Sequence, residues 1–127
     1  MNNKVVEWVL RIAVAGEFLG HGILAIGGKQ SWVGWFSQFG VTDTALATKL
    51  LFIVGVIDVV VALIVLIRPI RIVLLYMVIW GFWTAILRPI VGESIWDFVE
   101  RSANWGAPLA LLLMRGRIWN IRDWLRY

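Results

Sequence analysis

The chain has 127 residues, of which 61% are hydrophobic and 16% are charged. A soluble domain of this size cannot bury so much apolar surface, so the composition excludes a soluble globular protein and indicates an integral membrane protein. The net charge is +4, but the chain has no soluble basic domain, which excludes a nucleic-acid partner. The absence of cysteine excludes thiol nucleophiles, disulfide relays and cysteine-held iron–sulfur clusters.

Four apolar runs are long enough to cross the hydrocarbon core of a bilayer, which takes about 20 helical residues. The sequence predicts transmembrane helices over 5–26, 46–67, 70–87 and 95–114, so we expect an all-α, integral membrane four-helix bundle that forms a single domain over 1–127. The first run has no small-residue cleavage site, so we expect this helix to be retained. The fourth run is the most polar, and a three-helix alternative without it stays open.

Aromatic residues recur at helical spacing after the first predicted span. Trp32, Trp35, Phe36 and Phe39 fall at i, i+3, i+4 and i+7, which places them on one face of a helix. This pattern predicts a short interfacial helix over 29–39. An ordinary aromatic belt at the membrane surface is the alternative explanation.

Basic residues set the expected orientation, because cytoplasmic loops of membrane proteins collect Lys and Arg. They flank the second connection and follow the last span, so we expect both termini in the cytoplasm and the connections 27–44 and 89–94 outside. Contact of this basic collar with anionic membrane lipid is also expected. The third helix is expected to end before Pro89. The collar residues are Arg68, Arg71, Arg115, Arg117, Arg122 and Arg126.

Ionisable residues at membrane depth are costly and face either a partner or a wet cavity. If their helix faces converge, they form an outward-facing polar pocket walled by tryptophans, with no metal site because the chain has one histidine and no cysteine. The alternative is that these groups are interhelical ion pairs that hold the bundle together. The candidate ligand-binding residues are Glu17, His21, Asp58, Trp80, Trp83, Arg88, Asp97, Glu100, Arg101 and Asn104.

Gly16 and Gly20 form a pair of small residues four positions apart in the first predicted span. Such pairs let helices approach closely, within one chain or in a homo-oligomer. His21 follows directly, and two roles stay open for it: a hydrogen bond across such a contact, or quinone hydrogen bonding and proton relay.

Two stretches resemble the DoxX family of small membrane proteins. The first leads from Arg11-Ile12 through Gly16 to Phe18-Leu19-Gly20-His21-Gly22, and the second runs from Arg101 to Leu109. Many members carry a lysine shortly after the His-Gly pair, whereas this chain has apolar residues there. Matched by position, the family's motif residues are Arg11, His21, Gly22, Asn104 and Pro108.

The resemblance implies a multi-pass protein of the bacterial or archaeal inner (plasma) membrane, related to the DoxD subunit of thiosulfate:quinone oxidoreductase. We therefore expect a quinone- or lipid-linked accessory subunit of a membrane oxidoreductase system, with quinone as the cofactor, His21 and Glu17 bonding its headgroup, and Trp80 and Trp83 stacking on it. A non-enzymatic ligand-binding or assembly module with a partner subunit is the alternative. A small oligomeric proton-coupled carrier is the third hypothesis, and whether any reaction is catalysed stays open.

Overall fold

The computed structural model describes residues 3–115 and 121–126, and within these ranges the chain is helical with no strand. Arg117, one of the predicted collar residues, lies outside the described residues. The described elements are α1 (Asn3–Ile26), α2 (Gln30–Trp35), the 3-10 helix η1 (Phe36–Phe39), α3 (Thr44–Ile67), α4 (Arg71–Ile90), α5 (Ile95–Val99), α6 (Ser102–Met114) and the 3-10 helix η2 (Ile121–Leu125).

Three of the described helices, α1, α3 and α4, are long and apolar enough to cross a membrane. The prediction of an all-α chain with such helices is confirmed for the described residues. The short helix expected over 29–39 is also present, as α2 followed by η1.

The predicted helix over 95–114 is not continuous, because α5 ends at Val99 and α6 begins at Ser102. The hydroxyl of Ser102 donates to the carbonyl of Val99 at 2.7 Å and competes with the backbone bond that would continue the helix. The remaining α6 has 13 residues, a length of about 20 Å that is shorter than the hydrocarbon core.

The third predicted helix is longer than expected, since α4 continues through Pro89 to Ile90. Proline removes one backbone donor, but the last turn still closes through the Val91 amide, which donates to the Leu87 carbonyl at 2.9 Å. Gly92, at a φ of 99°, then turns the chain away.

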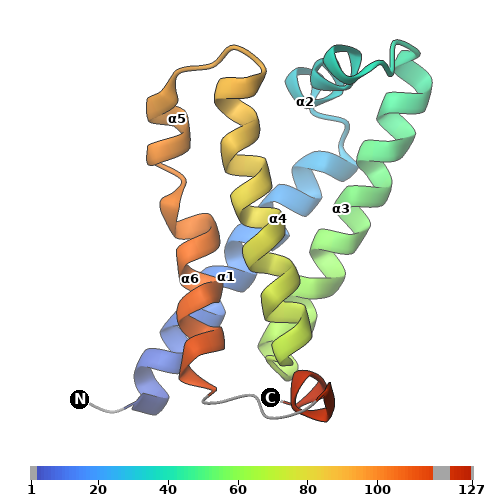
Figure 1. Ribbon diagram of the computed structural model, residues 1–127. Helices are drawn as coiled ribbons and strands as arrows, with labels where there is room; N and C mark the ends of the chain where they lie inside the picture. The colour runs from blue at the N-terminus through green and yellow to red at the C-terminus, as the bar shows by residue number, and fades with distance from the viewer. Residues whose placement is uncertain (1–2, 116–120, 127) are drawn as a thin grey trace.

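The long helices form two close pairs, α1 with α3 and α4 with α6 (Figure 1). Glycines allow both contacts. A Cβ atom at Gly55 would lie 2.6 Å from the carbonyl oxygen of Gly22, and one at Gly81 would overlap the backbone carbonyl of Asn104. A core that includes Val14, Phe18, Val65, Leu74, Met77 and Leu111 joins the two pairs.

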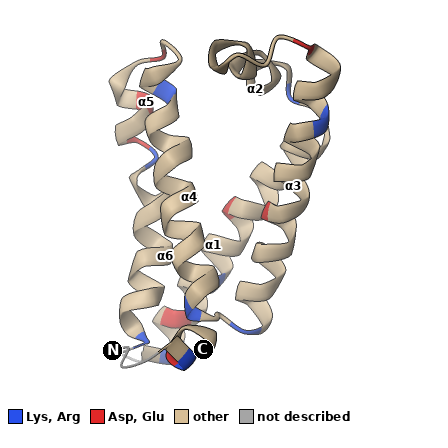
Figure 2. Cartoon of the chain, turned by 45° about the vertical axis from the view of Figure 1, so that its right-hand side comes forward, with Lys and Arg blue, Asp and Glu red and all other residues tan. Residues whose placement is uncertain are grey.

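The start of α1, the α3–α4 connection, the end of α6 and η2 lie together at one end of the molecule, here called the terminal end (Figure 1). The opposite end, with α2, η1 and the α4–α5 connection, is called the far end. Charged positions are concentrated toward these two ends (Figure 2). The long apolar stretches between them expose mainly hydrophobic side chains, which is the pattern of helices that face lipid.

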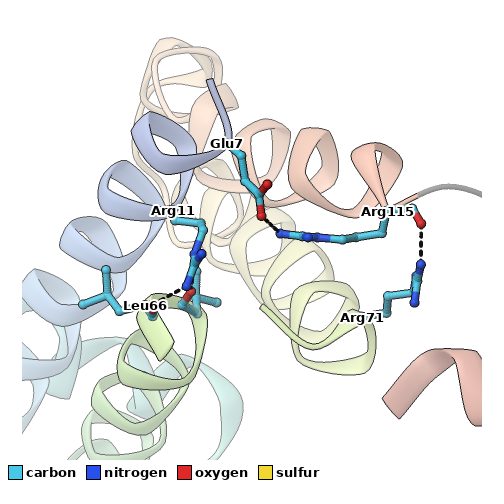
Figure 3. A network of polar contacts seen from close by, with 6 residues as sticks. Glu7, Arg11, Leu66, Arg71 and Arg115 are labelled. Carbon is cyan, nitrogen blue, oxygen red and sulfur yellow. Dashed lines mark hydrogen bonds and ion pairs between the residues drawn. The ribbon is translucent and has the colours of Figure 1, made fainter. Parts of the chain in front are cut away.

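Polar contacts hold the terminal end together (Figure 3). Arg11 donates from Nε to the Val65 carbonyl at 2.9 Å and from Nη2 to the Leu66 carbonyl, two of the last carbonyls of α3. Arg115 forms an ion pair with Glu7, and Arg71 donates to the Arg115 carbonyl. These contacts tie the start of α1 to the end of α3 and to the end of α6.

Candidate functional site

A cavity of about 280 Å³ lies between α3 and α4, with α1 at one side and the α2–η1 segment across the far end. Neither α5 nor α6 contributes a lining residue. The polar residues in its wall are His21, Asp58, Thr84 and Arg88. The aromatic residues in its wall are Trp32, Trp35, Phe36, Phe39, Trp80 and Trp83.

The α2–η1 segment is held over the cavity by a turn and a small core. Gly28, at a φ of 70°, reverses the chain directly after α1, a conformation that glycine adopts at little cost. Trp32 and Val33 are then buried against Ala25 of α1 and Leu51 of α3. This packing turns the aromatic face of the segment toward the cavity.

Ring contacts connect this segment to the cavity walls. The ring of Trp32 meets His21 edge-on with centroids 5.6 Å apart, and Phe39 contacts Trp83 of α4 with centroids 6.4 Å apart. Aromatic pairs at such distances stabilise a fixed arrangement of the rings. The walls therefore offer flat apolar surfaces that suit the faces of a planar ligand.

Arg88 lies on the last turns of α4 and closes the cavity toward the far end. Its guanidinium carbon lies 4.6 Å from the ring centroid of Trp35, and its Nη1 lies 3.7 Å from a carboxylate oxygen of Glu93. Its Nε is buried and has no hydrogen-bond partner among the described residues. Cation–π and ionic contacts hold the side chain in place, and a donor remains for an acceptor group.

Asp58 lies near the middle of α3, on the face that packs toward α1, and is only 3% exposed. Its Oδ1 is buried and accepts no hydrogen bond from any described residue. A buried carboxyl oxygen without a partner is costly. Asp58 therefore joins Arg88 and Trp32, whose Nε and Nε1 atoms are also buried without a partner among the described residues, as a lining residue that lacks a hydrogen bond.

Five of the ten predicted site residues line the cavity, whereas the other five lie outside it. Glu17 interacts electrostatically with Asp58 and Arg101. Glu100 is exposed and pairs with Arg101 at 3.4 Å. The residues in the cavity wall are His21, Asp58, Trp80, Trp83 and Arg88, and those outside it are Glu17, Asp97, Glu100, Arg101 and Asn104.

None of the candidate residues of the last predicted span lines the cavity, and the break between α5 and α6 divides them. Asp97 belongs to α5, which packs beside α4, while Asn104 belongs to α6. Pro108 has no N–H to offer the Asn104 carbonyl, and that carbonyl lies against Gly81 instead. The break in the helix therefore separates residues that a continuous helix would align.

Sequence reasoning did not assign several lining residues to the site. Thr84 and Leu87 follow Trp80 at i+4 and i+7, a spacing that could have added them to the Trp80 face of α4. Leu51 and Val54 lie in the apolar run of α3 between Lys49 and Asp58 and carry no such signal. The four aromatics of α2–η1 were predicted to share one face, and all four line the cavity.

Within the described ranges, no group of three or more His, Asp or Glu residues could hold a metal ion. No protein-family model, curated protein or solved structure matches the chain. The resemblance to the DoxX family therefore rests on the short motifs alone.

Proposed function

We propose that this chain is a DoxX-like, multi-pass protein of a bacterial or archaeal plasma membrane, and that its cavity binds the ring of a membrane-soluble quinone. In this role it serves as an accessory subunit of a membrane oxidoreductase system. The observation that carries the proposal is a cavity between two membrane-length helices, with aromatic walls and three ionisable side chains. These side chains are His21, Asp58 and Arg88.

The chemistry of the walls suits such a ring. Trp80 and Trp83 provide faces for stacking, and Arg88 and the N–H of His21 can donate hydrogen bonds to quinone oxygens. Small-molecule sites are commonly apolar clefts with a few convergent polar groups. A quinone suits such a site, because it has a flat ring with an oxygen at each end.

The cavity has an exposed apolar edge, which supports a ligand that enters from the bilayer. Trp83 is 41% exposed and Phe39 is 52% exposed, although both line the cavity. They lie on α4 and η1, next to surfaces made of apolar side chains. A ring bound between them would leave an isoprenoid tail in the lipid.

The fourth crossing is proposed to consist of α5 and α6 together, which places both termini in the cytoplasm and the cavity in the outer half of the membrane. The shared position of the start of α1 and of η2 at the terminal end supports this arrangement (Figure 1). The arginines gathered there follow the usual bias of cytoplasmic surfaces.

The test is native mass spectrometry of the mildly solubilised protein, with extraction and identification of the molecules that travel with it. We expect a quinone in the wild type, and about a tenfold loss or more in Trp83→Ala because one stacking surface is removed. The matched control is Trp96→Ala, since Trp96 is 71% exposed on α5 and lies outside the cavity. A wild-type protein without quinone, or equal retention in both variants, contradicts the proposal.

A second candidate function, an assembly module, is favoured by the surface of α5. Ile95 is 57% exposed and Trp96 is 71% exposed, and both lie beside the exposed Glu100. This surface suits a partner helix. Photo-crosslinking from position 96 in intact membranes is expected to capture a partner subunit in this case, and a crosslink to lipid alone rejects it.

The third hypothesis, an oligomeric carrier, depends on Gly16 and Gly20. A Cβ atom at either glycine would meet nothing within 4 Å, so this face of α1 is open to a second copy. The oligomeric state in the same mass spectra tests the hypothesis, and a monomer contradicts it.

A further inference from the structure

Within the described ranges, no cation interacts electrostatically with the Asp58 carboxyl. Electrostatic interactions link Asp58 to Glu17 of α1 and Tyr76 of α4, neither of which lines the cavity. Tyr76 stacks on Trp80 with ring centroids 6.3 Å apart. Neither Glu17 nor the Tyr76 hydroxyl donates a hydrogen bond to the buried Oδ1 of Asp58.

The remaining lining groups cannot meet this need either. His21 contacts Trp32 at the α2 side of the cavity, and the hydroxyl of Thr84 donates to the Gly81 carbonyl at 3.1 Å. Arg88 is held toward the far end by Trp35 and Glu93. Among the described residues, the buried Oδ1 of Asp58 therefore remains an acceptor without a donor.

The two ends of the cavity can therefore hydrogen-bond different groups of a ligand. Toward the far end, Arg88 offers donors and calls for an acceptor oxygen. In the middle of α3, the buried Oδ1 of Asp58 is an acceptor that calls for a donor. A ring with a hydroxyl at each end satisfies both, because a hydroxyl accepts as well as donates, whereas a quinone has only acceptors.

We propose that the cavity selects a ring that carries a hydroxyl group, the quinol rather than the quinone, and that this hydroxyl donates its hydrogen bond to Asp58. The inference rests on the proposed function and adds the redox form of the ligand and the residue that recognises it. No covalent step is involved, since the quinol binds as it is. Selectivity arises because a quinone has no donor and leaves the buried Oδ1 of Asp58 without a hydrogen bond.

The experiment compares three ligands with the same ring: tetramethylhydroquinone, tetramethylbenzoquinone and the dimethyl ether of the hydroquinone. Binding to the full-length protein in detergent is measured by isothermal titration calorimetry without oxygen. We expect the hydroquinone to bind at least about tenfold more tightly than the other two, as expected when a buried acceptor gains its missing hydrogen bond.

Variants of Asp58 test whether this residue causes the preference for the hydroquinone. In Asp58→Ala the preference for the hydroquinone is expected to disappear, and in Asp58→Asn a reduced preference is expected, since the amide keeps an acceptor oxygen but can also donate from its NH₂ group to a quinone oxygen. If Asp58→Ala does not fold, Asp58→Asn carries the test. Glu100→Ala, which removes an exposed acid outside the cavity, is expected to retain the full preference.

The outcomes separate the inference from the proposed function. If none of the three rings binds the wild type, the proposed function fails and the inference fails with it. If the rings bind but the quinone is held as tightly as the hydroquinone, or more tightly, only the inference is overturned. A preference that survives unchanged in both Asp58 variants overturns it as well.

Discussion

Arg11 shows how a charged side chain can be kept inside an apolar helix pair. It is 7% exposed, and its donors reach the carbonyls of Val65 and Leu66, which have no partner within α3 because the helix ends at Ile67. Its guanidinium carbon also lies 3.9 Å from the ring centroid of Trp8. The charge is therefore compensated by helix-end carbonyls and an aromatic face.

The first prediction concerns this contact. Replacing Arg11 by Met should lower the free energy of unfolding by about 2–3 kcal/mol, because it leaves two carbonyls without their charged donor. Equilibrium unfolding of the detergent-solubilised protein measures the loss. Lys49→Met, a change at an exposed basic residue of α3, serves as the control. Equal stability of the two variants would show that Arg11 has no structural role.

At the scale of the elements, glycines determine how closely the helices pair. Gly22 and Gly55 bring the backbones of α1 and α3 into contact, and Gly81 does the same for α4 and α6. Gly16 and Gly20, which formed the more conspicuous sequence pair, face open space. A spacing rule identifies glycines on one face of a helix, but it does not say which face meets another helix.

The second prediction tests this close approach. Gly55→Ala should destabilise the protein by about 1–3 kcal/mol, as expected for an extra methyl group in a filled interface, because its Cβ atom would lie 2.6 Å from the Gly22 carbonyl oxygen. Gly106→Ala is the matched control, since a Cβ atom there meets nothing within 4 Å. We expect the control to be neutral or slightly stabilised, because alanine favours helices. Unfolding curves of both variants measure the difference, and a stable Gly55→Ala would contradict it.

At the scale of the whole molecule, the proposed orientation places the terminal end in the cytoplasm. The chain has no cysteine, so a single introduced thiol reports its own position. The third prediction is that a membrane-impermeant maleimide labels Ser31→Cys in intact cells but labels Asn3→Cys only after permeabilisation. Both positions are exposed, on α2 and at the start of α1. The reverse pattern would invert the proposed topology.

Much of this architecture could be predicted from the sequence because hydropathy and helical spacing are local properties. They located α1, α3, α4 and the aromatic segment to within a few residues. The break before Ser102 was not predicted, since it depends on a side-chain hydrogen bond to Val99. Among the candidate site residues, Asp58 and Arg88 line one cavity while Glu17 does not, because that outcome depends on how the helices are rotated in the fold.

The contacts of Arg11 and Glu7 also bear on how the protein is made. Arg11 lies in α1, which is synthesised before α3, and its acceptors are 54 and 55 residues further along the chain. The ion pair of Glu7 forms later still, because its partner Arg115 follows it by 108 residues. We therefore expect the start of α1 to stay near the membrane surface or the insertion machinery during synthesis, and to settle to its final depth only when α3 and then α6 arrive.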